Sequence, residues 1–261
     1  MSSSSTSVGP VLQARGISKR FGGLQALSEV DLTVGQGEHV ALVGDNGAGK
    51  STLVKMLTGA DSPDSGEVWF DGSVVHFHSP LDARRAGIET VYQTLALAEH
   101  LDVAANLFLG REEYRIRLGP FSILNLRSMR SKARDILAMT GVQIPDLRAP
   151  VLGMSGGQRQ GVAIARAAGW GSRIIVLDEP TAALGVQETA KVEEIIRGLK
   201  RRGVAMLMIS HNLRQVFDLV DTVWVLRHGR MAGHVSVQDT VAEEVVAMIT
   251  GAHEATGTEF A

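Results

Sequence analysis

Short hydrophobic runs alternate with segments of helical spacing in the second half of the chain. The runs at residues 173–177, 204–209 and 222–226 are compact and rich in aliphatic residues, as is typical of buried strands. Between and after them, hydrophobic residues recur at positions i, i+3, i+4 and i+7 of two segments: Val192, Ile195, Ile196 and Leu199, then Leu213, Val216, Phe217 and Val220. Strands and helices in this order predict an α/β fold with right-handed βαβ units on a mostly parallel sheet.

The N-terminal part of the chain predicts an antiparallel β layer in addition to this sheet. Residues 11–17 and 30–34 have the pattern of strands. Asp71 and Gly72 lie between strand-like runs at residues 67–70 and 74–78, and an Asp-Gly pair in that position is a strong signal for a β-hairpin.

The middle of the chain has a third pattern. From about residue 95 to residue 165 the alternation weakens, short helical patches recur, and Arg and Leu are frequent. We interpret this stretch as a helical subdomain inserted into the α/β core. We expect a disordered Ser-rich tail at residues 1–10, one domain without internal repeats at residues 11–250, and a flexible tail at residues 251–261.

Composition narrows the possible functions. The chain has 261 residues, of which 44% are hydrophobic, and a net charge of −2, so nothing in its bulk charge favours nucleic acid or anionic lipid. The absence of cysteine excludes disulfides, thiolate metal sites and cysteine nucleophiles. The N-terminus lacks the features of a signal peptide, and no apolar run approaches the ~18 residues of a membrane span. We therefore expect a soluble chain that reaches a membrane only through a partner.

A glycine-rich loop follows the buried strand predicted at residues 39–43 and precedes helix-forming residues at 50–59. Its nine residues match G-x-x-x-x-G-K-[ST], extended by one threonine: Gly44, Asp45, Asn46, Gly47, Ala48, Gly49, Lys50, Ser51 and Thr52. Glycines let successive backbone N–H groups surround phosphate oxygens, and the helix N-terminus adds a positive dipole. In this pattern Lys50 reaches the β- and γ-phosphates and Ser51 binds Mg²⁺. An ordinary glycine turn before a helix is the alternative, which the strand–loop–helix context disfavours.

Two later segments add candidate chemistry. The apolar run at residues 174–177 ends in Asp178 and Glu179, which would bring one carboxylate towards the metal near Ser51 and a second towards an attacking water. A turn before the helix predicted at residues 159–168 consists of Met154, Ser155, Gly156, Gly157 and Gln158, with Ser155 as the expected N-cap. In isolation each segment is more often a loop opening or a helix start. Their order along the chain favours a functional site.

With these motifs in order, the sequence resembles the ATP-binding cassette (ABC) transporter ATPases over residues 11–250. The loop ending in Lys50 matches Walker A, Asp178 and Glu179 match Walker B, and Ser155 lies in a variant of the LSGGQ signature with Met for Leu. Further matches are Gln93 at the Q-loop, His211 at the switch histidine and Phe21 at the aromatic position that stacks on adenine.

The resemblance implies an ATPase that works as a pair of cassettes. ATP would lie between the Walker A loop of one cassette and the signature of the other, with Ser155, Gly156, Gly157 and Gln158 acting in trans. Ser51, Gln93 and Asp178 would bind Mg²⁺, while Glu179, His211 and Gln93 would be catalytic. The implied partners are a second cassette, most simply in a homodimer, permease subunits at the cytoplasmic face of the membrane and, indirectly, a solute-binding protein, but no nucleic acid.

Several segments narrow the resemblance to single-cassette importers of monosaccharides such as ribose, xylose and fructose. They are residues 89–93, 106–112 and 178–186. Two positions depart from common patterns. Gly185 stands where most ABC cassettes have an Asp in the D-loop, although the sugar subgroup often has Gly there, and Thr94 follows Gln93 where sugar cassettes commonly have Asp. The first bears on communication between the two ATP sites and the second on coupling to the permease.

Three other functions stay open at this stage. Residues 20–23 also fit a cassette that imports branched-chain amino acids, although the segment at 158–166 favours sugar. A soluble ABC ATPase of DNA repair or translation usually carries a long coiled coil or a second cassette, which this chain does not show. A regulatory nucleotide-binding module without turnover is disfavoured by Glu179 and His211.

Overall fold

A six-stranded sheet in the order β12-β11-β3-β10-β9-β6 forms the centre of the molecule. The computed structural model describes residues 9–118 and 121–252, so most of both expected tails falls outside the described residues. Five strands of this sheet are parallel: β3 (His39–Val43), β6 (Ile88–Val91), β9 (Ile174–Asp178), β10 (Ala205–Ile209) and β11 (Thr222–Arg227). The edge strand β12 (Arg230–Ser236) runs antiparallel to β11. The expected mostly parallel α/β sheet is thus confirmed.

The side chains of the central strands alternate between two hydrophobic cores, one on each face of the sheet. In β3, Val40 and Leu42 belong to one core, whereas Ala41 and Val43 belong to the other. All four are fully or almost fully buried. This explains why the strand is an unbroken hydrophobic run, since both of its faces are covered.

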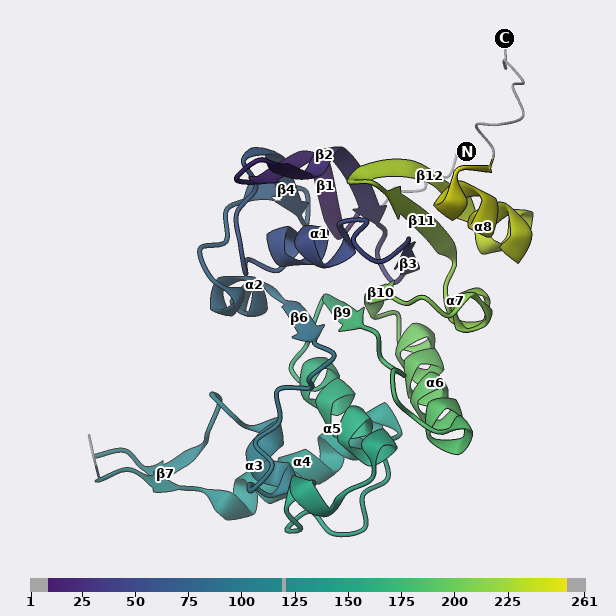
Figure 1. The fold of residues 1–261 in the computed structure, drawn as a ribbon. Coiled ribbons are helices and arrows are strands. Elements are labelled where there is room, and N and C mark those ends of the chain that lie inside the picture. The colour runs from purple at the N-terminus through teal and green to yellow at the C-terminus, as the bar shows by residue number, and fades with distance from the viewer. Residues whose placement is uncertain (1–8, 119–120, 253–261) are drawn as a thin grey trace, which may run out of the picture.

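A four-stranded antiparallel sheet covers one face of the central sheet, and helix α1 contributes to the core below it (Figure 1). Its order is β2 (Leu24–Val34), β1 (Leu12–Phe21), β4 (Ser65–Phe70) and β5 (Ser73–Val75). The expected hairpin at Asp71 and Gly72 joins β4 to β5. Helix α1 (Lys50–Leu57) buries Leu53 and Leu57 in this core, so the glycine loop that precedes α1 is held between the two sheets.

The lower lobe in Figure 1 is mainly helical and lies between β6 and β9 along the chain. It contains α3 (Val103–Leu107), α4 (Leu126–Thr140), the 3₁₀ helix η2 (Val151–Gly153) and α5 (Gly156–Ala168). It also carries a two-stranded hairpin that the sequence analysis did not predict: β7 (Tyr114–Ile116) and β8 (Ile123–Leu124). This hairpin projects away from the lobe, so its side chains bury little and leave no clear pattern.

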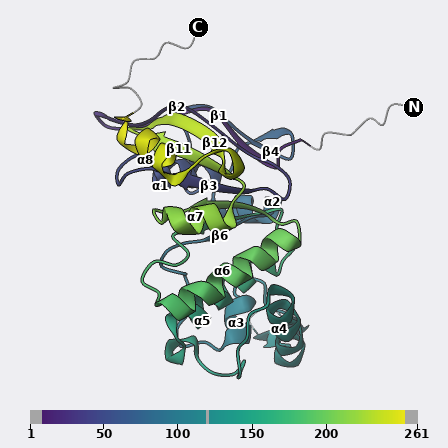
Figure 2. The same ribbon diagram turned by 90° about the vertical axis from the view of Figure 1, so that its right-hand side faces the viewer.

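The remaining helices flank the sheet. Helix α2 (Pro80–Ala86) precedes β6, while α6 (Val186–Arg201) and α7 (Leu213–Leu219) lie on the side facing the viewer in Figure 2. After β12 come η3 (Val237–Asp239) and α8 (Ala242–Thr250), which packs against β11. None of the helices in the described part of the chain has the length and apolar character that crossing a membrane requires.

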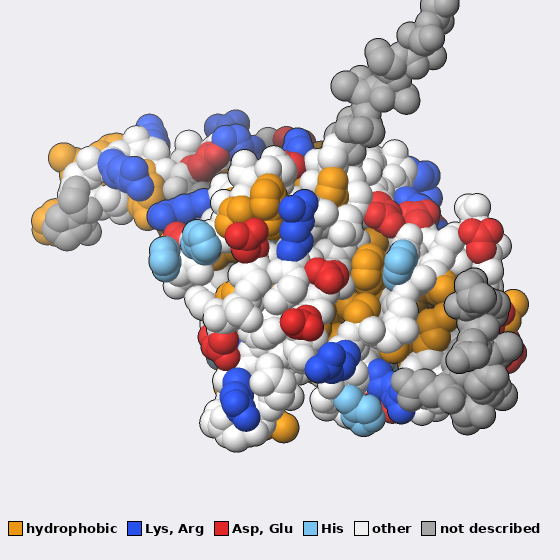
Figure 3. Space-filling view, turned by 90° about the horizontal axis from the view of Figure 1, so that it is seen from above, with side chains coloured by type: hydrophobic (Ala, Val, Ile, Leu, Met, Phe, Trp, Pro, Cys, Tyr) orange, Lys and Arg blue, Asp and Glu red, His pale blue; other side chains and the backbone are white. Residues whose placement is uncertain are grey.

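The face formed by the antiparallel sheet mixes charges of both signs. In Figure 3, which views the molecule from above, Lys and Arg side chains are interspersed with Asp and Glu. A nucleic-acid surface generally gathers positive charge on one face. The face in this view has no such single-sign patch.

Candidate nucleotide-binding site

The glycine loop sits at the carboxyl end of β3 and is shaped by contacts with β11 and β2. Gly44 has φ 150°, and a Cβ at this position would lie 2.1 Å from the carbonyl oxygen of Leu226. Gly49 has φ 108°, and its Cβ would lie 2.8 Å from the carbonyl oxygen of Ala26. Only glycine fits both the backbone angles and these close approaches, so the loop has one conformation fixed by its surroundings.

Lys50 begins α1 and folds back over the loop. Its Nζ donates hydrogen bonds to the carbonyl oxygens of Gly44 (2.6 Å) and Asp45 (2.9 Å). Partial burial lowers the pKa of Lys50, and the nearby carboxylates of Glu179, Asp45 and Asp178 oppose that shift. The ammonium group is therefore held at the loop by carbonyl oxygens, which a phosphate group can replace.

Two carboxylates lie opposite this loop, where β9 ends. Asp178 is the last residue of β9, and burial, followed by the charge of Glu179, raises its pKa, while Lys50 lowers it. Glu179 has φ 51°, uncommon for a residue with a side chain, and its N–H donates to the carbonyl oxygen of Ile209 at 2.9 Å. The end of β10 therefore fixes the backbone of Glu179.

His211 lies against the second carboxylate. Its Nδ1 is 2.9 Å from the Glu179 carboxylate, and its ring is 75% exposed, whereas the Glu179 side chain is 19% exposed. The two residues come from neighbouring strands, since Glu179 follows β9 and His211 follows β10. Parallel strands thus bring together two residues that lie 32 positions apart in the sequence.

The other two predicted residues of this site, Gln93 and Phe21, come from the ends of β6 and β1. Gln93 is exposed and comes two residues after β6, and Phe21 ends β1 with 48% of its surface exposed. One cavity of about 890 Å³ is lined by thirteen of the predicted residues: Phe21, Gly44, Asp45, Asn46, Gly47, Gly49, Lys50, Ser51, Thr52, Gln93, Asp178, Glu179 and His211.

Ala48 does not line this cavity, although it belongs to the loop. Its side chain is 4% exposed, and its N–H donates to the carbonyl oxygen of Asp45 at 3.1 Å. Its carbonyl oxygen accepts from the N–H of Gly229 at 2.9 Å. Ala48 therefore holds the loop in shape rather than facing a ligand.

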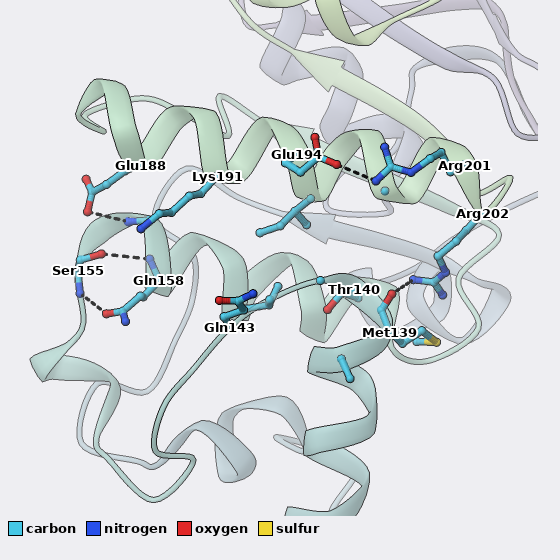
Figure 4. A pocket seen from close by; sticks show the side chains of 16 residues that line it. Met139, Thr140, Gln143, Ser155, Gln158, Glu188, Lys191, Glu194, Arg201 and Arg202 are labelled. Atoms are coloured by element: carbon cyan, nitrogen blue, oxygen red, sulfur yellow. Dashed lines mark hydrogen bonds and ion pairs between the residues drawn. The ribbon is translucent and has the colours of Figure 1, made fainter.

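The Ser-Gly-Gly turn lies elsewhere, at the start of α5. Ser155 is the N-cap: its Oγ accepts from the Gln158 N–H at 3.3 Å, and the Gln158 Oε1 accepts from the Ser155 N–H at 3.0 Å, a capping box (Figure 4). Ser155, Gly157 and Gln158 line a second cavity of about 710 Å³ between α4, α5 and α6. None of the four signature residues lines the cavity around the glycine loop.

The family follows from a comparison with known proteins. Residues 27–182 match the family model described as ABC transporter. The chain belongs to this family. Such cassettes bind nucleotide and hydrolyse ATP, and the cavity around Lys50 is the part of this cassette where the phosphate loop and the two carboxylates meet.

Among curated proteins, the cassette is 45% identical over 248 residues to the fructose import ATP-binding protein FrcA of Rhizobium meliloti, covering 94% of this chain and 95% of that one. It is 42% identical over 240 residues to the xylose/arabinose import ATP-binding protein XylG of Sulfolobus acidocaldarius, covering 92% and 94% of the two chains. It is 43% identical to the ribose import ATP-binding protein RbsA 1 of Rubrobacter xylanophilus, covering 93% of this chain but 47% of that longer one.

Solved structures agree on the fold. A dimeric ATP-binding cassette in a post-hydrolysis state, bound to ADP and Pi, superposes with a TM-score of 0.72 at 25% identity, covering 88% of this chain and 100% of that one. An ATP-binding cassette of an ABC transporter in its ADP conformation gives a TM-score of 0.74 at 25% identity, covering 92% and 95%.

The cavity of this cassette also contains residues that the sequence analysis missed. They are Leu24, Gln25, Ala26, Ala182, Ile209, His228 and Gly229. A Cβ at Gly229 would lie 2.6 Å from the Ala26 carbonyl oxygen, so the β11–β12 turn packs closely on the start of β2. A His-Gly pair between two apolar runs predicts a turn, but nothing in the sequence shows which loop that turn meets.

Proposed function

We propose that this cassette binds Mg-ATP in the cavity around Lys50, pairs with a second copy, and energises a permease that imports a monosaccharide. One observation carries the proposal. A single cavity collects the phosphate loop, both carboxylates, Gln93 and His211, while the signature turn lies outside it.

Backbone N–H groups of the loop and the Lys50 ammonium would hold the β- and γ-phosphates, as in other phosphate loops. Phe21, at the outer edge of the cavity, offers an exposed ring on which the adenine can stack. Asp45, Asn46, Gly47, Ala48, Gly49, Ser51 and Thr52 complete the phosphate-binding segment, with Ala48 acting through the loop's shape.

The residues present fit Mg²⁺. Ser51, Gln93 and Asp178 line the same cavity and offer a hydroxyl, an amide oxygen and a carboxylate, the oxygen ligands that this ion prefers. Burial already disfavours the charged form of Asp178, and a cation beside it would offset that cost. Bound there, Mg²⁺ would neutralise charge that develops on the phosphate oxygens.

Hydrolysis would depend on the pair formed by Glu179 and His211. The Glu179 carboxylate orients the attacking water and accepts its proton, and His211 keeps that carboxylate in place and reaches the γ-phosphate. The water lies between this pair and the γ-phosphate, which Lys50 holds.

The signature turn would serve the nucleotide of the partner cassette. It stands at the N-terminus of α5, a thirteen-residue helix whose dipole favours an anion. Ser155, Gly156, Gly157 and Gln158 would thus complete the other copy's site, and ATP would join two cassettes head to tail. Binding then favours a closed homodimer and hydrolysis an open one.

The permease would dock near the end of β6, just before Gln93. A groove of about 410 Å³ is lined there by Leu81, Arg84, Tyr92, Leu109 and Trp170, among others. Leu81 and Leu109 are each 42% exposed, and the partly buried ion pair of Glu89 and Arg111 forms its polar wall. A helix of the permease seated here would place the cassette at the cytoplasmic face of the membrane, with a solute-binding protein as an indirect partner.

The choice of a monosaccharide rests on relatives that this chain matches over nearly their whole length. FrcA and XylG are named for importing fructose and xylose/arabinose, and each is nearly the length of this cassette. The principal alternative is import of branched-chain amino acids.

Two experiments test the proposal. Purified cassette should release phosphate from Mg-ATP, and a Lys50→Ala variant should not; no release by the unmodified cassette would contradict it. In the host strain, deleting the gene should abolish uptake of labelled fructose, xylose or ribose. Loss of leucine uptake with sugar uptake intact would instead favour the amino-acid importer.

A further inference from the structure

The side chain of Glu188 joins the signature turn to the loop that follows Asp178 and Glu179. Glu188 lies in the first turn of α6. Its Oε1 accepts a hydrogen bond from the Gly157 N–H at 3.3 Å (Figure 4), and its Oε2 accepts one from the Gly185 N–H at 3.4 Å. Hydrogen bonding by the Ser155 side chain, then by these two N–H groups, lowers the pKa of Glu188.

The two segments also touch closely along their backbones. A Cβ on Gly157 would lie 2.9 Å from the Cβ of Glu188, and a Cβ on Gly156 would lie 2.8 Å from Cδ2 of Leu184. A side chain at Gly157 would therefore collide with the first turn of α6, whereas one at Gly156 would require the end of the Leu184 side chain to move. Neither segment can shift by much without the other.

A short chain of turns connects this contact to the catalytic carboxylate. The Ala182 N–H donates to the carbonyl oxygen of Glu179 at 3.1 Å, and the Leu184 N–H donates to that of Thr181 at 3.2 Å. Gly185 follows directly and donates to Glu188. Five residues thus separate Glu179 from Gly185, whose N–H is bonded to Glu188.

Two anions would compete for a hydrogen bond from the Gly157 N–H. In the structure it is bonded to the Glu188 carboxylate, and under the proposed function it would bond to the γ-phosphate on the partner cassette. Two anions on one N–H repel each other strongly in a closed interface. One of them must leave, and the mobile one is the side chain.

We propose that Glu188 is a positioning residue that holds the signature turn against the loop at residues 179–185 and is displaced when the partner's nucleotide arrives. The inference rests on the proposed function. Lys191, one turn further along α6 and on the same cavity, is a cation that can receive the displaced carboxylate (Figure 4). When the partner's nucleotide occupies the signature turn, the Gly185 N–H would lose its hydrogen bond to Glu188. The loop at residues 179–185 would then be free to shift.

The variant that tests this is Glu188→Gln, which keeps a hydrogen-bond acceptor but removes the charge. The full-length cassette is assayed for phosphate release over a range of Mg-ATP concentrations. The ATP concentration at half-maximal rate should fall about fivefold, because a neutral amide competes with the phosphate for the Gly157 N–H less strongly than a carboxylate does. The Hill coefficient should also fall towards one, with the maximal rate changed less than twofold.

A second readout uses dimer formation. In a Glu179→Gln background, size-exclusion chromatography at increasing ATP should show the added Glu188→Gln dimerising at lower ATP. Glu194→Gln is the matched control, because Glu194 lies on the same helix and pairs with Arg201 at 2.8 Å instead. It should leave both curves unchanged.

The outcomes separate this inference from the proposed function. If Glu188→Gln needs the same ATP concentration for its half-maximal rate as the unmodified, active cassette, or a higher one, the role of Glu188 is overturned. The proposed function then still stands. An unmodified cassette that releases no phosphate overturns the proposed function instead.

Discussion

Backbone geometry as well as side-chain contacts fixes the carboxylate of Glu179. Its positive φ is uncommon, and its N–H is bonded to the end of β10, so the side chain projects from a constrained position towards His211. Strained residues of this kind persist where the surrounding structure holds them, and they occur often at catalytic sites. The geometry therefore supports a water-orienting role better than that of an ordinary loop residue.

Replacing this carboxylate tests that role directly. In Glu179→Gln, steady-state phosphate release should fall by about 100-fold or more, the usual contribution of a general base. ATP binding should persist, because the phosphate loop is untouched, and an ATP-bound dimer should accumulate on size-exclusion chromatography. Glu67→Gln, on the exposed surface of β4, is the control and should behave as the unmodified cassette. Unimpaired turnover in Glu179→Gln would remove Glu179 from its assigned role.

At the scale of residues, the sequence was informative where function depends on a local pattern. The loop ending in Lys50 and the carboxylates after β9 occur as contiguous motifs, and the structure brings them into one cavity. His228 and Glu188 were not predicted, because their positions depend on contacts between segments distant in sequence. A Gly-rich loop shows that its backbone must bend, but not which turn packs against it.

At the scale of elements, two glycines inside helices provide a matched pair. Gly198 lies within α6, and a Cβ there would meet only the end of the flexible Arg201 side chain at 3.7 Å. Gly161 lies within α5, where a Cβ would lie 3.1 Å from Cγ1 of Val142. Both glycines have helical backbone angles that alanine can adopt, but only Gly198 has space around it for the added methyl group.

Gly198→Ala should therefore stabilise the cassette by about 1 kcal/mol, since glycine is unfavourable in a helix interior. Gly161→Ala should stabilise the cassette by less than this amount, or destabilise it, because the tight contact with Val142 offsets the helix preference. Urea unfolding monitored by circular dichroism measures both changes. Equal stabilisation by the two substitutions would show that the packing around Gly161 yields without cost.

Predictability also differed between elements for a physical reason. Strand β3 and helix α5 bury continuous or regularly spaced apolar residues, and their positions were predicted to within a few residues. The hairpin β7–β8 has exposed strands, β12 is a half-buried edge strand, and α8 is a short terminal helix that buries only Val245. Elements that bury little leave a weak periodic pattern, so these three were not found.

A buried histidine ties three elements together. His39 begins β3, is fully buried, and places Nδ1 3.3 Å from the carbonyl oxygen of Leu219 and Nε2 3.1 Å from that of Val204. Burial is the main cause that lowers its pKa below 6.5, with the positive charge of Lys200 adding to it, and Asp221 partly opposing. The ring therefore gives up its proton at a lower pH in the folded cassette than in the unfolded chain.

Stability should consequently depend on pH just below 6.5. In that range the unfolded chain binds a proton at this position that the folded cassette does not, so stability rises with pH, by up to about 1.4 kcal/mol per unit, and is lost as pH falls. His39→Gln should flatten the slope of unfolding free energy between pH 5 and 7. The exposed His100→Gln is the control, and an equal flattening in it would contradict the assignment to His39.

At the scale of the whole molecule, the important feature is the separation of three sites. The cavity around Lys50, the signature turn and the groove beside β6 share none of the predicted site residues. Because the phosphate loop and the signature turn line different cavities of one cassette, the proposed site is incomplete without a second copy. The groove is then free for a different partner.

The groove should therefore be separable from catalysis by substitution. Leu109→Glu places a charge on the apolar part of the groove, where a docked helix would bury it at a cost of several kcal/mol unless it is paired. Phosphate release by the isolated cassette should stay within twofold of the unmodified value, while sugar uptake in a complemented deletion strain should fall about tenfold or more. Val246→Glu, at an exposed position of α8 that does not line the groove, should leave uptake unchanged.

Should Leu109→Glu impair phosphate release and uptake equally, the groove would belong to the catalytic unit; if uptake were unaffected, the permease would have to dock elsewhere. An effect on uptake alone is the result expected if this groove transmits the opening and closing of the dimer, because the chemistry lies on β9 and β10 while the groove lies beyond β6 at the edge of the same sheet.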